Sequence, residues 1–120
     1  MSRVTFVLHR GGTSETTGTA LALADRLMAR GHRVAVFAHD EAAELTVRGA
    51  PAAPVVAALV RRGMHAGTLD WVVEGEPDLE GGPRHHRPWS QVAGVVPGDH
   101  ADLWALVRAA DVVLTPNAGG

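Results

Sequence analysis

The chain has 120 residues, 46% of them hydrophobic and 20% charged, which is the usual size of one globular domain with its own core. Its formal net charge is −2 and its basic residues are scattered, so we expect neither nucleic acid nor an anionic membrane as a partner. The chain contains no cysteine, which excludes disulfides, thiolate metal sites, persulfide carriage and thiol nucleophiles.

The first part of the chain predicts a strand, a helix and a second strand. Residues 4–8 are mostly apolar and β-branched, which is typical of a strand covered on both faces. The Gly, Thr and Ser segment 11–18 predicts a loop, and the apolar residues after it have helical spacing up to Gly31. Residues 33–38 predict the second strand. Two strands joined by one helix predict a right-handed βαβ unit with parallel strands.

The middle of the chain predicts two helices and a third strand. Residues 41–48 predict a short helix closed by Gly49, and Pro54 suits the first residue of another helix that extends to Gly63. Residues 68–74 predict the third strand. The apolar stripe of the second of these helices consists of Val55, Val56, Leu59 and Val60.

The last third begins with a change of composition. Residues 75–91 are rich in Gly, Pro and charge, which predicts a long flexible surface loop. Residues 92–96 predict another short strand, and Asp99 suits the N-cap of a helix that extends to about Ala109. Residues 111–115 predict a final strand.

Alternating strands and helices predict a single α/β domain over residues 1–120. We expect a flavodoxin-like three-layer sandwich around a small, mostly parallel sheet of about five strands, followed by a tail over residues 116–120. Trp71 and Trp104 lie in apolar patterns and are expected in the core or in an interface. The chain enters its first strand without a basic leader, and no apolar run approaches the roughly 18 residues of a membrane span, so we expect a cytoplasmic protein.

The segment between the first strand and the first helix is the strongest local signal. Its glycines allow a sharp turn, and the helix N-terminus offers N–H groups to an anion. It has neither the Walker lysine pattern nor G-x-G-x-x-G, so it specifies no nucleotide. The alternative is that Thr16 or Thr17 only caps the helix. The candidate ligand-binding residues are Arg10, Gly11, Gly12, Thr13, Ser14, Thr16 and Thr17.

His9 and His39 each follow a predicted strand, and the ends of adjacent parallel strands meet at one edge of the sheet. With Asp40 they form the candidate catalytic set, in which a carboxylate orients a histidine for acid/base chemistry. Zinc and iron accept such ligands, but the spacing has no metal signature, so we assign no metal ligand and identify no cofactor. The alternative is that both histidines are polar strand-end residues bonded to nearby backbone.

Three further features have simpler alternatives. His85 and His86 belong to a basic patch that could close over an anionic ligand or reach a neighbouring subunit, although solvated loop residues are the favoured explanation. We interpret Asp99 and His100 as a helix cap and a first-turn residue. The terminal diglycine is similar to that of ubiquitin-like sulfur carriers, but a flexible tail is the simpler explanation.

The chain resembles the small sulfur-relay proteins DsrE, DsrF and TusD and their DsrE-like relatives. The resemblance lies in the strand at 4–8, the run from the helix at 20–31 into residues 32–37, and the closing segments 98–104 and 109–115. It implies a compact α/β domain that forms homo-oligomers (dimer, trimer or hexamer) or hetero-oligomers. Sulfur-transferring members carry persulfide on a cysteine after the third strand. Because this chain has none, the resemblance implies a member without that chemistry and transfers no catalytic residue.

The first forty residues also resemble the amino-terminal half of a GT-B glycosyltransferase. That class needs a second Rossmann-like domain for its nucleotide sugar, so this interpretation holds only if the 120 residues are a fragment of a longer chain. The leading hypothesis is therefore a cysteine-less DsrE-like protein that binds a small anionic ligand or a partner protein at the carboxyl ends of the first two strands. The alternatives are a histidine-dependent enzyme, with or without a metal ion, acting on a small metabolite, and a structural subunit of a hetero-oligomer. The sequence does not decide whether the protein is an enzyme.

Overall fold

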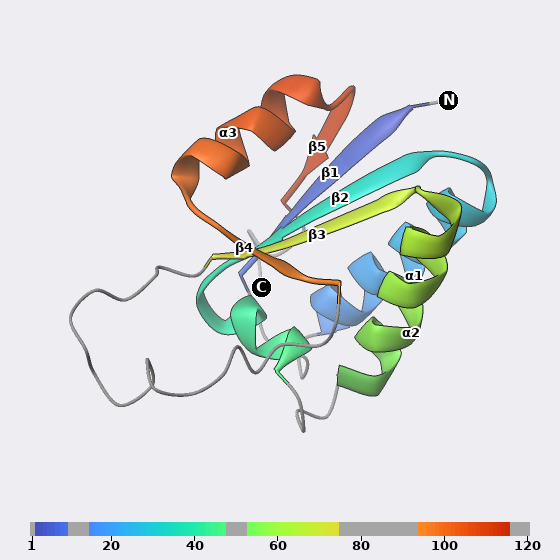
Figure 1. Ribbon diagram of the computed structural model, residues 1–120, viewed down its shortest axis with the longest axis horizontal. Coiled ribbons are helices and arrows are strands. Elements are labelled where there is room, and N and C mark those ends of the chain that lie inside the picture. Colours follow the sequence, from blue (N-terminus) through green and yellow to red (C-terminus); the bar gives the residue numbers. More distant parts are fainter. Residues whose placement is uncertain (1, 10–14, 48–52, 75–93, 116–120) are drawn as a thin grey trace.

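A computed structural model of the protein describes residues 2–9, 15–47, 53–74 and 94–115. Within these residues, five parallel strands form one sheet in the order β4-β3-β2-β1-β5 (Figure 1). The strands are β1 (Arg3–Leu8), β2 (Arg33–Ala38), β3 (Leu69–Glu74), β4 (Val96–Gly98) and β5 (Val112–Leu114). The predicted α/β fold with a small parallel sheet is therefore confirmed.

Helices cover both faces of the sheet. The helices are α1 (Glu15–Ala29), the 3₁₀ helix η1 (Asp40–Thr46), α2 (Ala53–Ala66) and α3 (His100–Ala109). α1 and α2 lie against one face, and α3 lies against the other (Figure 1). None of these helices is long and apolar enough to cross a membrane.

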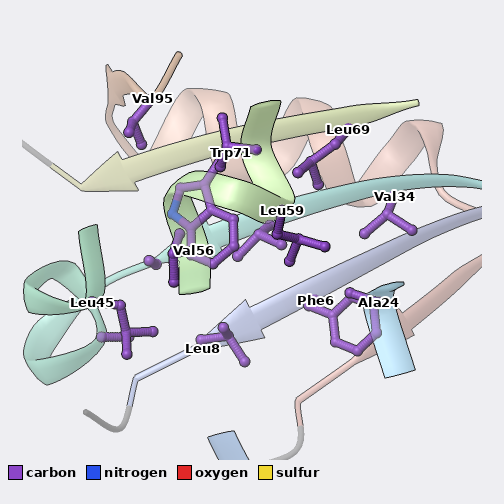
Figure 2. Close-up of a cluster of buried hydrophobic side chains, with 14 of the residues drawn as sticks. Phe6, Leu8, Ala24, Val34, Leu45, Val56, Leu59, Leu69, Trp71 and Val95 are labelled. Atoms are coloured by element: carbon purple, nitrogen blue, oxygen red, sulfur yellow. The ribbon is translucent and has the colours of Figure 1, made fainter. Parts of the chain in front are cut away.

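The main core lies between the sheet and the layer of α1, α2 and η1. Successive side chains of a strand point to opposite faces, so every second residue of β1, β2 and β3 enters this core. Figure 2 shows Phe6, Leu8 and Trp71 meeting side chains from the helices, and the Trp71 side chain is 1% exposed. The expectation that Trp71 is a core residue is confirmed.

The first helix begins earlier than the sequence predicts. The sequence predicts a loop over residues 11–18. In the structure, residues 15–18 belong to α1, which begins at Glu15. Thr17, Ala20 and Ala24 are buried at spacings of three and four residues, so one helical stripe packs on the sheet from the first turn. The tertiary contact of Thr17 outweighs the low helix propensity of Thr and Gly.

The two middle helices also differ in detail from the prediction. The short helix after β2 is a 3₁₀ helix, and α2 continues past Gly63 to Ala66. Val55 is 61% exposed and does not belong to the buried stripe of α2, whereas Val56, Leu59 and Val60 do. At Gly63, α2 passes so close to Leu69 that no side chain would fit. Glycine therefore allows α2 to continue at this distance from the strand. Gly49 lies outside the described residues.

At the carboxyl end of the chain, the cap was predicted correctly and one strand was not. Asp99 caps α3: its carboxylate accepts hydrogen bonds from the N–H groups of Ala101 and Asp102, while the Asp102 carboxylate accepts one from the Asp99 N–H. The strand expected at 92–96 instead occupies Val96–Gly98. Trp104 is 61% exposed and is therefore not a core residue. The predicted loop at 75–91 and tail at 116–120 lie outside the described residues.

Candidate functional site

The carboxyl ends of three neighbouring strands carry polar side chains in register. Leu8 pairs with Ala38 across β1 and β2, and Ala38 pairs with Val73 across β2 and β3. The residues that directly follow Leu8, Ala38 and Val73 are His9, His39 and Glu74, respectively. Alternation along the strands directs all three away from α1 and α2, toward the face covered by α3. They therefore form a row along one edge of the sheet.

The two histidines lie side by side, as the parallel arrangement predicts. Their ring centroids are 5.7 Å apart, with an angle of 47° between the ring planes. The N–H of His39 donates to the Leu8 carbonyl over 2.9 Å, which continues the sheet ladder to the base of both side chains. Both residues are partly buried, and the His39 ring also lies 6.1 Å from that of Phe37. The sheet thus fixes the relative position of two imidazoles at a partly solvated edge.

Asp40 accompanies His39 directly. One Asp40 carboxylate oxygen, Oδ2, lies 3.1 Å from His39 Nδ1, and the Asp40 side chain is 68% exposed. Asp40 is the one residue other than glycine with positive φ in the part of the chain that the structure describes, at 52°. Asp tolerates this left-handed conformation better than most residues do, at some cost in backbone energy. The turn from β2 into η1 therefore places the carboxylate beside the imidazole.

Glu74 and His100 complete the cluster, and sequence reasoning missed this role for both. His100 Nε2 lies 3.2 Å from Glu74 Oε2, and the Glu74 side chain is 34% exposed. The Asp99 cap starts α3 at His100 and so holds the imidazole near the end of β3. Glu74 could have been found as the last residue of the third predicted strand, since it ends at the same sheet edge as the histidines.

The predicted loop residues are only partly described. Arg10, Gly11, Gly12, Thr13 and Ser14 lie outside the described residues. Thr16 and Thr17 belong to the first turn of α1; Thr16 is half-buried and Thr17 fully buried. The burial of Thr17 favours a packing role for that side chain.

A hollow on the α3 face lies at the opposite edge of the sheet. It is bordered by the first residues of the strands, beneath the end of α3, and its lining includes Arg3, Thr5, Arg33, Asp70 and Leu106. The Thr5 hydroxyl donates to the Leu106 carbonyl over 3.2 Å and so ties α3 to β1 there. None of the clustered strand-end residues lines this hollow.

Comparison with solved structures identifies two proteins with the same fold. The YchN protein of E. coli superimposes with a TM-score of 0.71 at 19% identity, over 96% of this chain and 99% of that one. MTH1491 of Methanobacterium thermoautotrophicum, described as a protein of unknown function, gives a TM-score of 0.70 at 13% identity, over 95% and 99% of the two chains. No family model matches the sequence, and no curated protein matches it significantly. The chain therefore shares the DsrE/YchN fold, as its sequence resemblance implied.

Proposed function

We propose that the protein is a DsrE-like protein without sulfur-transfer activity, which binds a small anionic ligand at the carboxyl ends of β1 and β2. The observation that carries this proposal is the pairing of His9 and His39, whose ring centroids are 5.7 Å apart. In open α/β sheets, ligands bind outside the carboxyl ends of the strands. Imidazole N–H groups donate hydrogen bonds to carboxylate or phosphate oxygens. The absence of cysteine removes the persulfide chemistry of sulfur-relay proteins.

Phosphate and small carboxylates are suitable probes for this site. Calorimetric titration of the full chain, in buffer containing a chelator, is expected to give saturable binding. His9→Ala and His39→Ala are each expected to weaken it about tenfold, the loss of one charge-assisted hydrogen bond. His65→Ala is the matched control, because His65 is exposed near the end of α2, at the opposite edge of the sheet. Equal affinity in all three variants, or no binding at all, would contradict the proposal.

A second candidate function, as an association subunit, is favoured by the surface of α3 and β5. Trp104 is 61% exposed, and the edge strand β5 exposes both Val112 and Val113. Exposed apolar side chains on an edge strand and on the helix that precedes it are typical of surfaces that pair with another chain. We propose that this side of the molecule contacts a second copy of the chain.

A further inference from the structure

The candidate site contains more ligating groups than anion binding requires. One ligand atom from each of His39, Asp40 and Glu74 lies within 4.8 Å of the other two. From this geometry we infer that the three side chains bind a divalent transition-metal ion, such as Zn²⁺, at the carboxyl edge of the sheet. The inference deepens the proposed function and rests on the same location, since the ion would lie beside the histidine pair.

The donor chemistry suits such an ion. An imidazole nitrogen with two carboxylate oxygens is a set that zinc and other first-row divalent ions accept, and it needs no thiolate. Metal–ligand bonds of about 2.0–2.2 Å place neighbouring ligand atoms about 3.4 Å apart. To bind the ion, the three ligand atoms would therefore have to move about 1 Å toward one another. The side chains of His39, Asp40 and Glu74 are 27%, 68% and 34% exposed, which leaves the carboxylates free to rotate inward.

Charge also favours a cation at this position. Asp40 and Glu74 bring two carboxylates close together, where their like charges repel each other. A divalent ion between them removes this repulsion. It leaves a coordination position for water or for an oxygen of the anion, because three protein ligands do not complete a zinc shell.

Neighbouring residues support the three ligands. His100 Nε2 lies 3.2 Å from Glu74 Oε2 and can donate a hydrogen bond to this carboxylate. Such a bond would hold the Glu74 side chain in position, as hydrogen-bonding partners of metal ligands commonly do. His9 is the next nitrogen donor along the row, with its ring centroid 5.7 Å from that of His39. The positive φ of Asp40 is the backbone conformation that presents its carboxylate to the same point.

Equilibrium dialysis of the untagged full chain against Zn²⁺ alone tests the inference, with no phosphate present. We expect one Zn²⁺ per chain and a rise in Tm on addition of the ion. Glu74→Gln preserves the shape of the side chain and removes the charge, and we expect it to weaken Zn²⁺ binding at least tenfold and to abolish the Tm rise. His39→Ala is expected to do the same, and circular dichroism checks that both variants fold.

Two controls separate this site from the other histidines. His65→Ala and the double variant His85→Ala/His86→Ala are expected to bind Zn²⁺ with unchanged affinity. Zinc binding that survives Glu74→Gln and His39→Ala, or that is lost in the double variant, would overturn the inference, and so would the absence of binding. Phosphate binding in chelator that persists without any Zn²⁺ binding would refute the metal site and leave the proposed function intact. If the protein binds Zn²⁺ but does not bind phosphate, whether or not Zn²⁺ is present, the metal site stands and the proposed function is refuted.

Discussion

Asp40 is the residue at which backbone geometry and candidate chemistry coincide. Its φ of 52° is a conformation that glycine adopts at little cost and a residue with a Cβ adopts with strain. A glycine at this position would form the turn into η1 more easily but would offer no carboxylate to His39. The presence of Asp is therefore better explained by its side chain, 3.1 Å from His39 Nδ1, than by the turn.

Substitutions at this position separate the two roles. We expect Asp40→Ala to be less stable than Asp40→Gly by about 1 kcal/mol, because only alanine retains the Cβ that makes positive φ costly. Both variants should lose Zn²⁺ affinity to a similar extent, since neither has a carboxylate. Urea unfolding and zinc dialysis of the pair measure the two effects. Equal stability of the two variants would show that the left-handed conformation is not maintained.

The charge of Asp99 is linked to stability through the hydrogen bonds of its cap. The Asp102 N–H donates to its carboxylate and holds the pKa of Asp99 below the ordinary value of 3.8; burial opposes this effect, and the Ala101 N–H adds to it. Because the pKa is lowered in the folded state, the charged carboxylate stabilises the protein above about pH 3.8. This contribution is lost as the pH falls through the lowered pKa.

Asp99→Asn tests this pH dependence, because the amide retains an oxygen for capping and cannot ionise. At pH 7 the variant should melt a few degrees below the wild type, on the order expected for a weakened cap. The difference in Tm should shrink below about pH 3.8, as the pH falls toward the lowered pKa at which the folded wild-type carboxylate becomes protonated. Thermal unfolding followed between pH 7 and pH 2 measures it. A difference that stays constant over this range would contradict a role for the charge.

At the scale of elements, two helical glycines occupy opposite environments. In α1, a Cβ added at Gly18 would meet nothing within 4 Å. In α2, a Cβ at Gly63 would collide with the Cβ of Leu69, the first residue of β3. The close approach at Gly63 lets α2 and β3 be joined by a two-residue connection, with the Thr68 N–H donating to the Gly63 carbonyl over 2.8 Å.

The same substitution should therefore have opposite effects at the two positions. Gly18→Ala is expected to stabilise the protein by up to about 1 kcal/mol, the difference in helix propensity. Gly63→Ala is expected to destabilise it by about 1–3 kcal/mol, because overpacking outweighs the propensity gain. Denaturant unfolding of both variants gives the comparison. A stabilised Gly63→Ala variant would mean that α2 and β3 can separate without cost.

The elements that the sequence predicts well are those with a strong local pattern. The strands at 4–8 and 33–38 have continuous apolar runs, and the helix between them makes a parallel pairing nearly obligatory. The proximity of His9 and His39 follows from that pairing alone, whereas their roles stay predictions. The end of the third predicted strand places Glu74 at the same sheet edge, but its position directly beside His39 depends on which strand neighbours β2, and sequence periodicity does not contain that information.

Other differences arise where tertiary contacts outweigh local preference. The early start of α1 depends on the burial of Thr17 against the sheet, and the continuation of α2 beyond Gly63 depends on its contact with Leu69. The left-handed conformation of Asp40 has no sequence signature, because Asp is also common in ordinary turns. Packing of a helix against the sheet decides the first two features, and sequence periodicity along a helix does not contain that information.

At the scale of the whole molecule, the two faces of the sheet are covered unequally. Among the elements that the structure describes, α1 and α2 bury a continuous core, whereas α3 is the one helix on the other face and has no fully buried residue (Figure 1). The edge strand β5 is only three residues long and half-exposed. We therefore propose that the α3 side, rather than the α1 side, contacts a second copy in the homo-oligomer that the sequence predicts.

Trp104→Glu tests that prediction against a matched control on the other layer. Trp104 on α3 and Val55 on α2 are both 61% exposed, so a glutamate disturbs the packing of the monomer little at either position. If copies associate through α3 and β5, Trp104→Glu places a charge in the contact and should lower the mass measured by light scattering toward that of one chain. Val55→Glu should retain the mass of the wild type. A wild-type monomer, or a mass changed only by Val55→Glu, would exclude association through this surface, because the desolvation of an interfacial tryptophan is what would hold the copies together.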